Sequence, residues 1–173
     1  AFNDSNGDNV GATTITINGD VTGVSADAVY ATNTFNATDL IINTGEYSNI
    51  IGSDNGLFLR NYGTGVTTLT ISGDVQGNSG ILSKVGGAAQ ELTITTYAGS
   101  NIIGTTNNGI YTKNRGAYAT TLTINGDVTS SSDTAINTFN AYTATDLTIT
   151  TGAASNIIGG DSGIIANTDG TGA

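Results

Sequence analysis

The amino-acid sequence predicts an all-β fold, a right-handed parallel β-helix in which short strands stack coil over coil. Three observations lead to this prediction. A unit of about 53 residues occurs three times, each unit consists of two similar halves, and the strand-like runs within each half alternate apolar and polar residues. No single half could bury its apolar face alone, so stacking of the halves into a solenoid is the arrangement that produces a core.

The repeat is clearest at the start of each unit. The run TTITINGDV at residues 13–21 returns as TTLTISGDV at 67–75 and as TTLTINGDV at 120–128. Between these runs lie DLII at 39–42, ELTI at 91–94 and DLTI at 146–149, and each is followed by the phrase SNIIG. Both sets are interpreted as the first strands of coils, which predicts about six coils arranged as three two-coil repeats.

A third strand is expected to close each coil. It is predicted within GLFLR (56–60), GILSK (80–84), GIYTK (109–113) and GIIAN (163–167), and in the remaining halves around 28–32 and 134–138. The alternatives fail on period or content. A leucine-rich repeat is shorter, a propeller blade has four antiparallel strands, and a helical solenoid needs a 3.6-residue period.

The 173 residues (1–173) are expected to form a single β-helical segment of a longer rod. Residues 1–12 resemble the tail of a preceding repeat, and the repeats themselves occupy 13–66, 67–119 and 120–173. Neither end carries a capping element, and uncapped strand edges can pair with another chain. We therefore expect either a continuing rod or copies that associate end to end.

The alternation within the first strands predicts which side chains face the core. In Thr-Ile-Thr-Ile the apolar residues are two apart, so they share one face of the strand. Two continuous aliphatic columns are predicted from the pairs Ile15/Ile17, Leu40/Ile42, Leu69/Ile71, Leu92/Ile94, Leu122/Ile124 and Leu147/Ile149. Phe35 and Phe139 hold the same place in the phrase Asn-Thr-Phe-Asn and are expected to cover the same corner.

Composition excludes several classes of partner. The formal net charge of −10 opposes binding to nucleic acid, which requires a basic stripe, and it opposes binding to an anionic membrane in the same way. No apolar run is long enough for a transmembrane helix, so no membrane span is expected. A chain without Cys that is rich in Thr, Asn and Gly fits a secreted rod without disulfides. The sequence opens with neither Met nor a signal peptide, so we interpret it as a processed part of a longer exported protein.

Repeats of the form TTLTINGDV, DLTITT, SNIIG and GI resemble the passenger regions of autotransporter adhesins and related bacterial surface proteins. The resemblance covers the whole chain and is architectural, without a diagnostic site motif. The carboxy-terminal barrel of that family is not in this sequence. The resemblance implies a β-helical stalk displayed outside a Gram-negative outer membrane, where it would meet a host-cell, matrix or like-cell surface.

The chain is expected to be no enzyme and to bind no cofactor. It has no His or Cys, so the common nucleophile–base arrangements are absent. Asp39, Glu91 and Asp146 recur once in every repeat, which marks them as a repeat feature rather than a pair of catalytic carboxylates. A carbohydrate-active β-helix, the competing hypothesis, would instead place irregular long loops and unlike residues along one groove.

No metal site is expected either. The oxygen-rich loops at 4–8 and 53–56 could hold calcium weakly, but solvated turns explain them better. Turn chemistry also explains the Gly-Asp-Val carboxylates, which are Asp20, Asp74 and Asp127.

Outward threonines suggest a further class of function, ice binding, because flat Thr-x-Thr arrays on a β-helix can match ice. One column is predicted from Thr16, Thr70, Thr93, Thr123 and Thr148, broken by Ile41, and a neighbouring column from Thr14, Thr68 and Thr121. The acids Asp39, Glu91 and Asp146 are expected to interrupt that neighbouring column in every second coil. Strand propensity and solubility therefore explain the threonines better than ice binding does.

The four basic residues are the candidate partner-contact residues. Arg60, Lys84 and Lys113 follow the third strand in three successive coils, and Arg115 lies two positions beyond Lys113. Stacked like charges repel, so acidic neighbours or an acidic partner should compensate them. Five tyrosines are expected to join the same surface: Tyr47, Tyr62, Tyr97, Tyr111 and Tyr118. The alternative is that the cations keep the strand face soluble and discourage sideways sheet pairing.

The sequence thus favours an extracellular structural or adhesive rod, a stalk or adhesin segment on a bacterial surface. The competing hypothesis within the same class is a self-assembling extracellular filament subunit that stacks through open β-helix ends.

Overall fold

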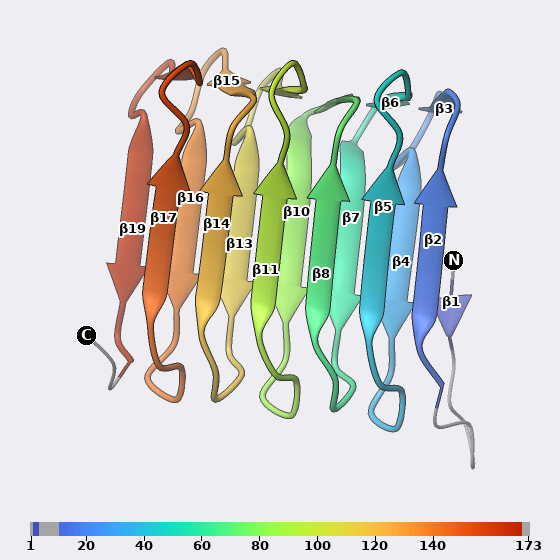
Figure 1. Ribbon diagram of the computed structural model, residues 1–173, viewed down its shortest axis with the longest axis vertical. Helices are drawn as coiled ribbons and strands as arrows, with labels where there is room; N and C mark the ends of the chain where they lie inside the picture. The colour runs from blue at the N-terminus through green and yellow to red at the C-terminus, as the bar shows by residue number, and fades with distance from the viewer. Residues whose placement is uncertain (1, 4–10, 171–173) are drawn as a thin grey trace.

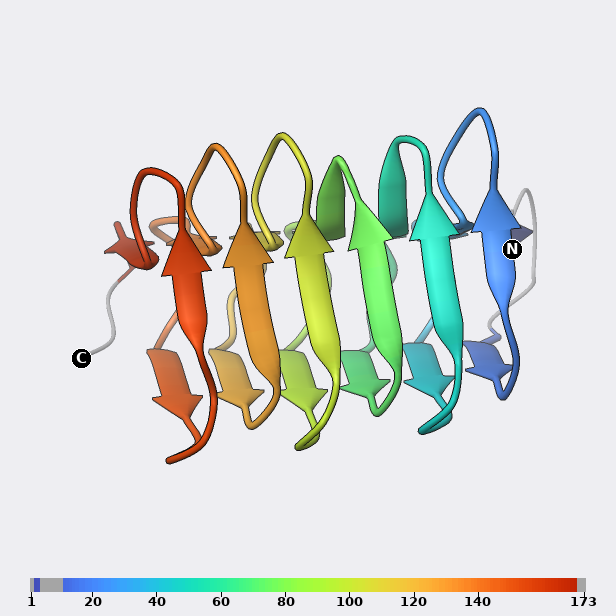
Figure 2. The ribbon, with the colours of Figure 1, turned by 90° about the horizontal axis from the view of Figure 1, so that it is seen from above.

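The computed structural model describes residues 2–3 and 11–170, and it confirms the predicted fold class. The described residues contain nineteen strands and no helix. They wind as a right-handed parallel β-helix of six coils, each of roughly 27 residues (Figure 1). Viewed from above, the coils lie side by side along the rod (Figure 2).

Three parallel sheets run along the rod, and each coil contributes one strand to each of them. The sheet that we name the threonine sheet consists of β2 (Thr13–Ile17), β5 (Leu40–Thr44), β8 (Thr67–Ile71), β11 (Leu92–Thr96), β14 (Thr120–Ile124) and β17 (Leu147–Thr151). The short sheet consists of β3 (Val21–Gly23), β6 (Asn49–Gly52), β9 (Asp74–Gly77), β12 (Asn101–Gly104), β15 (Asp127–Ser130) and β18 (Ile157–Gly159).

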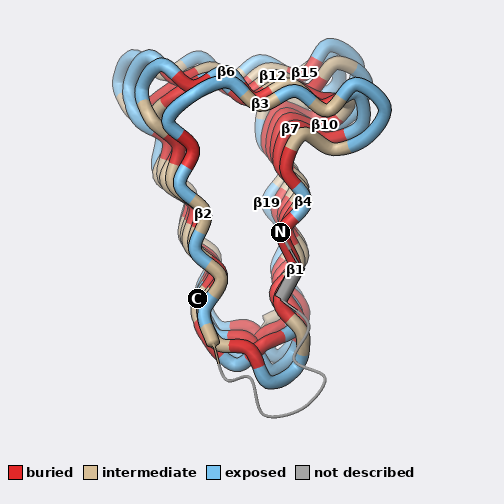
Figure 3. Tube along the Cα trace, turned by 90° about the vertical axis from the view of Figure 1, so that its right-hand side faces the viewer, coloured by how far each residue is buried: buried red, intermediate tan, exposed pale blue. Residues whose placement is uncertain are grey.

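The third sheet, named the basic sheet, carries the third strand of each coil. It consists of β1 (Phe2–Asn3), β4 (Val29–Asn33), β7 (Asn55–Asn61), β10 (Ser79–Val85), β13 (Ile110–Asn114), β16 (Ile136–Asn140) and β19 (Ile164–Thr168). These positions confirm the predicted third strands. Seen end-on, the threonine and basic sheets face each other across the core, and the short sheet closes one end of the section (Figure 3).

The predicted pair of continuous aliphatic columns is wrong, because alternate coils are offset by two residues. Only the middle inward column is aliphatic in every coil: Ile15, Ile42, Leu69, Ile94, Leu122 and Ile149. In each flanking column an aliphatic residue alternates with threonine. Thr67, for example, pairs with Leu40 and Leu92, and Thr44 pairs with Ile17.

The buried threonines of one flanking column satisfy the turns of the next coil. Thr96 Oγ1 accepts hydrogen bonds from the backbone N–H groups of Asn125 and Gly126, both at 3.1 Å. Thr44 does the same for Ser72 and Gly73, at 3.0 and 3.3 Å. A buried N–H without an acceptor is costly, so this position requires a hydroxyl in alternate coils. The hydroxyl thus recurs once in every two coils, in step with the repeat.

Buried asparagines perform a similar role where the basic sheet turns into the threonine sheet. Four of them are fully buried in one column: Asn33, Asn61, Asn114 and Asn140. Asn114 Nδ2 donates to Thr120 Oγ1 at 3.0 Å, and its Oδ1 accepts from the backbone N–H of Gly116 at 2.7 Å. Asn61 makes the equivalent bonds to Thr67 and Gly63.

The Gly-Asp-Val carboxylates link one coil to the next. Asp74 Oδ1 accepts hydrogen bonds from both the backbone N–H and the side-chain amide of Asn101, each at 2.9 Å. Asp127 accepts the same two bonds from Asn156, at 2.8 and 3.1 Å. The phrase SNIIG thus supplies the donor that Gly-Asp-Val accepts. Its final glycine is also constrained, because a Cβ on Gly104 would collide with the following backbone.

The predicted acid interruption of the outward threonines is also wrong. The register places Thr93 between Thr68 and Thr121, and Thr95 between Thr70 and Thr123. Asp39, Glu91 and Asp146 precede the strands, where their backbone carbonyls accept from neighbouring strands. The interruptions are Ile41 and Asn43, both in β5.

We expect Thr96→Val to lower the free energy of unfolding by about 1–3 kcal/mol, because the backbone N–H of Gly126 loses its acceptor and that of Asn125 keeps only the backbone carbonyl of Thr96. Thr95→Val is the matched control, since Thr95 faces outward from the same strand, and its effect should stay within about 0.5 kcal/mol. Denaturant unfolding followed by circular dichroism measures both. Equal effects of the two substitutions would contradict the assigned role of Thr96.

We expect the chain to show no thermal hysteresis in freezing assays. Outward Thr on a sheet is accounted for by the fit of β-branched side chains to a pleated surface, without a ligand. Measurable hysteresis that Thr95→Lys with Thr123→Lys removes would overturn this expectation and assign ice binding to the threonine sheet.

Candidate functional site

All four basic side chains of the chain gather on the basic sheet or directly after one of its strands. Arg60 in β7, Lys84 in β10 and Lys113 in β13 are Cα partners across neighbouring strands. Arg115 follows the last residue of β13. Parallel strands lie about 4.8 Å apart, so three cations repeat at this step along the rod.

The period of the strand places these cations on the outside. In β7 the side chains of Leu57, Leu59 and Asn61 are fully or almost fully buried, while Phe58 and Arg60 between them are partly exposed. The cations therefore do not contribute to the core. The same column continues with Phe139, which is the Cα partner of Lys113.

Aromatic rings hold three of the cations against the sheet. The Arg60 guanidinium carbon lies 4.7 Å from the centre of the Phe58 ring, and Lys84 Nζ lies 5.6 Å from the same centre. Lys113 Nζ lies 5.4 Å from the centre of the Phe139 ring. Contacts of this kind contribute roughly 0.5–1 kcal/mol at exposed sites. The buried Arg60 Nε has no hydrogen-bond partner among the described residues.

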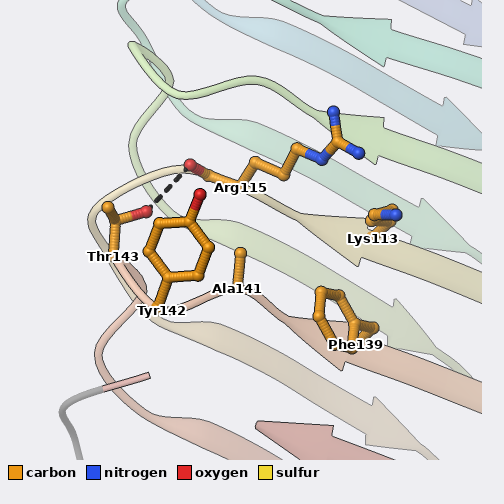
Figure 4. Close-up of a pocket in the computed structure, with 6 residues that line it drawn as sticks. All are labelled: Lys113, Arg115, Phe139, Ala141, Tyr142 and Thr143. Carbon is orange, nitrogen blue, oxygen red and sulfur yellow. Dashed lines mark hydrogen bonds between the residues drawn. The ribbon is translucent and has the colours of Figure 1, made fainter. Parts of the chain in front are cut away.

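Two neighbouring hollows lie beside these cations. The larger, of about 480 Å³, is lined by Lys113, Arg115, Phe139, Ala141, Tyr142 and Thr143 (Figure 4). In Figure 4 the cationic side chains lie along one edge, the two aromatic rings lie along the other, and Ala141 lies between the rings. Thr143 Oγ1 donates to the backbone carbonyl of Arg115 at 3.1 Å and thereby ties this turn to the coil before it.

The second hollow, of about 280 Å³, shares Lys113 and Arg115 and adds Tyr62, Lys84, Val85 and Tyr111. No acidic side chain is among the described residues that line either hollow. A third hollow, which shares Lys84 and Tyr111, contains one acid, Asp133. Lys84, Lys113 and Arg115 thus border a series of shallow depressions that follows the rod. We name this surface the basic face; it comprises the four cations Arg60, Lys84, Lys113 and Arg115 and the aromatic residues Phe58, Tyr62, Tyr111, Phe139 and Tyr142.

The predicted grouping of the tyrosines is only partly correct. Tyr62 and Tyr111 line the second hollow, and Tyr118 lies in the turn after β13. Tyr47 and Tyr97 lie in turns between the threonine and short sheets, at the opposite end of the strands from Tyr62 and Tyr118 (Figure 1). They do not belong to the basic face.

Sequence reasoning did not assign Tyr142 and Phe139 to this surface. Phe139 was matched to Phe35 through their shared phrase, and this match is wrong. Phe139 lies within β16, whereas Phe35 lies in the turn after β4, where its side chain is 76% exposed. The ring of Phe35 stacks on that of Tyr62, with 6.3 Å between the ring centres. The signal that could have placed Phe139 is the buried asparagine column, which aligns Asn140 with Asn114.

In the part of the chain that the structure describes, no group of three or more His, Cys, Asp or Glu side chains could hold a metal ion. Asp39 Oδ1 accepts from the backbone N–H of Val66 at 3.0 Å, which is a link between coils. Within the 53–56 loop, Asn55 donates to Asp27. The loop at 4–8 lies outside the described residues.

Comparison with protein-family models, curated proteins and solved structures finds no match for this chain. Within residues 2–3 and 11–170 there is no helix of the length and apolar character needed to cross a membrane. The case for a function therefore rests on the geometry of the rod and its basic face.

Proposed function

We propose that this chain is an adhesive segment of an extracellular rod on a bacterial surface, like the autotransporter adhesins that its repeats resemble. One observation carries the proposal. A chain with a formal net charge of −10 gathers all four of its cations on one face, three of them in register. Like charges placed opposite each other destabilise a sheet, so the arrangement favours a role in contact with an anionic surface.

The regularity of the rod supports a structural rather than a catalytic role. Each coil repeats the same three strands, and the turns between them are short. A stack of coils with a continuous aliphatic column is suited to holding a binding face at a fixed distance from an anchor. No long irregular loop overhangs the basic face in the described residues, as a substrate groove would require.

Removal of two cations from the basic face should weaken attachment. We expect beads coated with the Arg60→Gln, Lys84→Gln variant to attach several-fold less to host cells, matrix or like bacterial cells, because multivalent display amplifies small losses per molecule. Counting attached beads measures the effect.

The matched control places the same change in net charge on the threonine sheet. Thr70→Glu with Thr123→Glu also lowers the charge by two, at outward positions of β8 and β14. Its attachment should stay near that of the unsubstituted chain. Equal loss in both variants, or no loss in the first, would refute the proposed adhesive face.

A second candidate function, self-assembly through β-helix ends, is favoured by the register of the last described coil. Ile164 continues the inward column of Ile136 in this coil. Strand β17 has the order Leu-x-Ile-x-Thr. Within the rod, the next strand of the threonine sheet after such a strand has the order Thr-x-Leu-x-Ile, as in β8 and β14. Strand β2, the first strand of this sheet, has the equivalent order Thr-x-Ile-x-Ile. The first described coil of a second copy would therefore continue the alternation.

Under this second function, electron microscopy of the chain should show filaments with an axial repeat of about 10 Å, the height of two coils. Ile164→Lys should abolish them, because it places a charge in the stacking surface. Ile158→Lys is the control, since Ile158 is 59% exposed on the outside of β18 in the same coil. Short single rods at every protein concentration would exclude self-assembly.

A further inference from the structure

We infer that the basic face binds a linear acidic polysaccharide, laid along the rod so that its carboxylates meet Arg60, Lys84 and Lys113 in successive coils, with Arg115 beside Lys113 in the same coil. The inference rests on the proposed adhesive function and names the class of ligand.

The spacing of the cations favours a polymer over a small anion. Three of them repeat once per coil, about 4.8 Å apart along the rod. A small anion would meet one or two of them, whereas a chain of sugars with one carboxylate per ring presents its charges at a comparable step. At 4 Å the repulsion between two unit charges in water is about 1 kcal/mol, and such a ligand would relieve it along the column.

The polar and aromatic lining of the hollows suits sugar rings. Tyr142 is 74% exposed beside Lys113 and Arg115, and Tyr62 is 38% exposed in the adjoining hollow. An exposed aromatic ring offers an apolar surface to the C–H face of a sugar, and its hydroxyl offers a hydrogen bond. The cavity above Ala141 leaves room for a ring between the cations and Tyr142 (Figure 4).

The same geometry is less suited to single-stranded nucleic acid. Bases bind by stacking on open aromatic faces. The rings of Phe58 and Phe139 are already contacted by the chain's own cations, Arg60 and Lys84 for the first and Lys113 for the second. These rings orient the cations, and the ring of Tyr62 already stacks on Phe35, so few open ring faces remain for a run of bases. A polymer that needs a row of cations and only a single exposed ring, such as Tyr142, is the better match.

The test is calorimetric titration of the whole chain with a hexamer of galacturonic acid, with its methyl ester and with a thymidine hexanucleotide. The methyl ester keeps the sugar backbone and removes the charge, so we expect it to bind at least about tenfold more weakly than the acid. Binding of the acid should weaken as salt is added.

Variants assign the binding to the basic face. Lys113→Gln should weaken binding of the acid hexamer about three- to tenfold, as expected for one partly exposed charged contact. Tyr142→Ala should weaken it several-fold. Tyr47→Ala is its matched control, because Tyr47 is 87% exposed in a turn at the opposite end of the strands, and it should have no effect.

Three results would overturn the inference: equal binding of acid and ester, tighter binding of the hexanucleotide than of the acid, or unchanged binding in Lys113→Gln. Its failure is distinguishable from failure of the adhesive function. If bead attachment depends on Arg60 and Lys84 but the acid hexamer does not bind, the ligand class is wrong and the adhesive function stands. If attachment is independent of these residues, the adhesive function itself fails.

Discussion

Each turn of this rod brings backbone N–H groups against the core, and the fold depends on buried side chains that accept them. Thr44 and Thr96 each accept two such groups from the following coil. Asn61 and Asn114 accept one and donate to a neighbouring threonine. An unsatisfied buried donor costs about 1–3 kcal/mol, which is a large part of the stability of a small domain. The buried threonines and asparagines at the turns therefore determine the register of each coil relative to the next.

This constraint also explains the division of the core. A hydroxyl is needed in alternate coils, and in the coils between them an aliphatic residue fills the same column, as Ile71 does between Thr44 and Thr96. The middle column has no turn to satisfy and is aliphatic throughout. Hydrogen bonds to the turns are thus made by a flanking column of the threonine sheet, and continuous apolar packing is made by the middle column.

The sequence was sufficient for the fold class, the number of coils and the place of the third strands, because these follow from repeat length and apolar alternation. It was not sufficient for the register. A shift by two residues keeps every apolar side chain inside, so alternation cannot distinguish one register from the other. The decision is made by hydrogen bonds such as that of Thr96, between residues about 29 positions apart. The match of Phe35 with Phe139 failed for a different reason: the column of buried asparagines aligns Asn33 with Asn140, three residues away from the match that the shared phrase suggests.

The candidate site was predictable to the extent that it follows the strands. Arg60, Lys84 and Lys113 could be predicted from their common place four positions after a glycine. The contribution of Tyr142 was not visible, because it comes from a turn whose position depends on the register of the next coil. Contacts between side chains of adjacent coils are therefore the part of the site that the sequence alone does not predict.

Inward positions are fixed by packing and by the turns, whereas outward positions are left open by the fold. The threonine sheet fills its outward positions with residues that any strand accepts. One outward column of the basic sheet is different, since it holds Arg60, Lys84 and Lys113. Neutral residues in that column would avoid the repulsion between cations on neighbouring strands. The rings of Phe58 and Phe139 offset part of that repulsion and at the same time hold the cations in place. The proposed binding function rests on this arrangement, which folding does not require and which aromatic contacts nevertheless order.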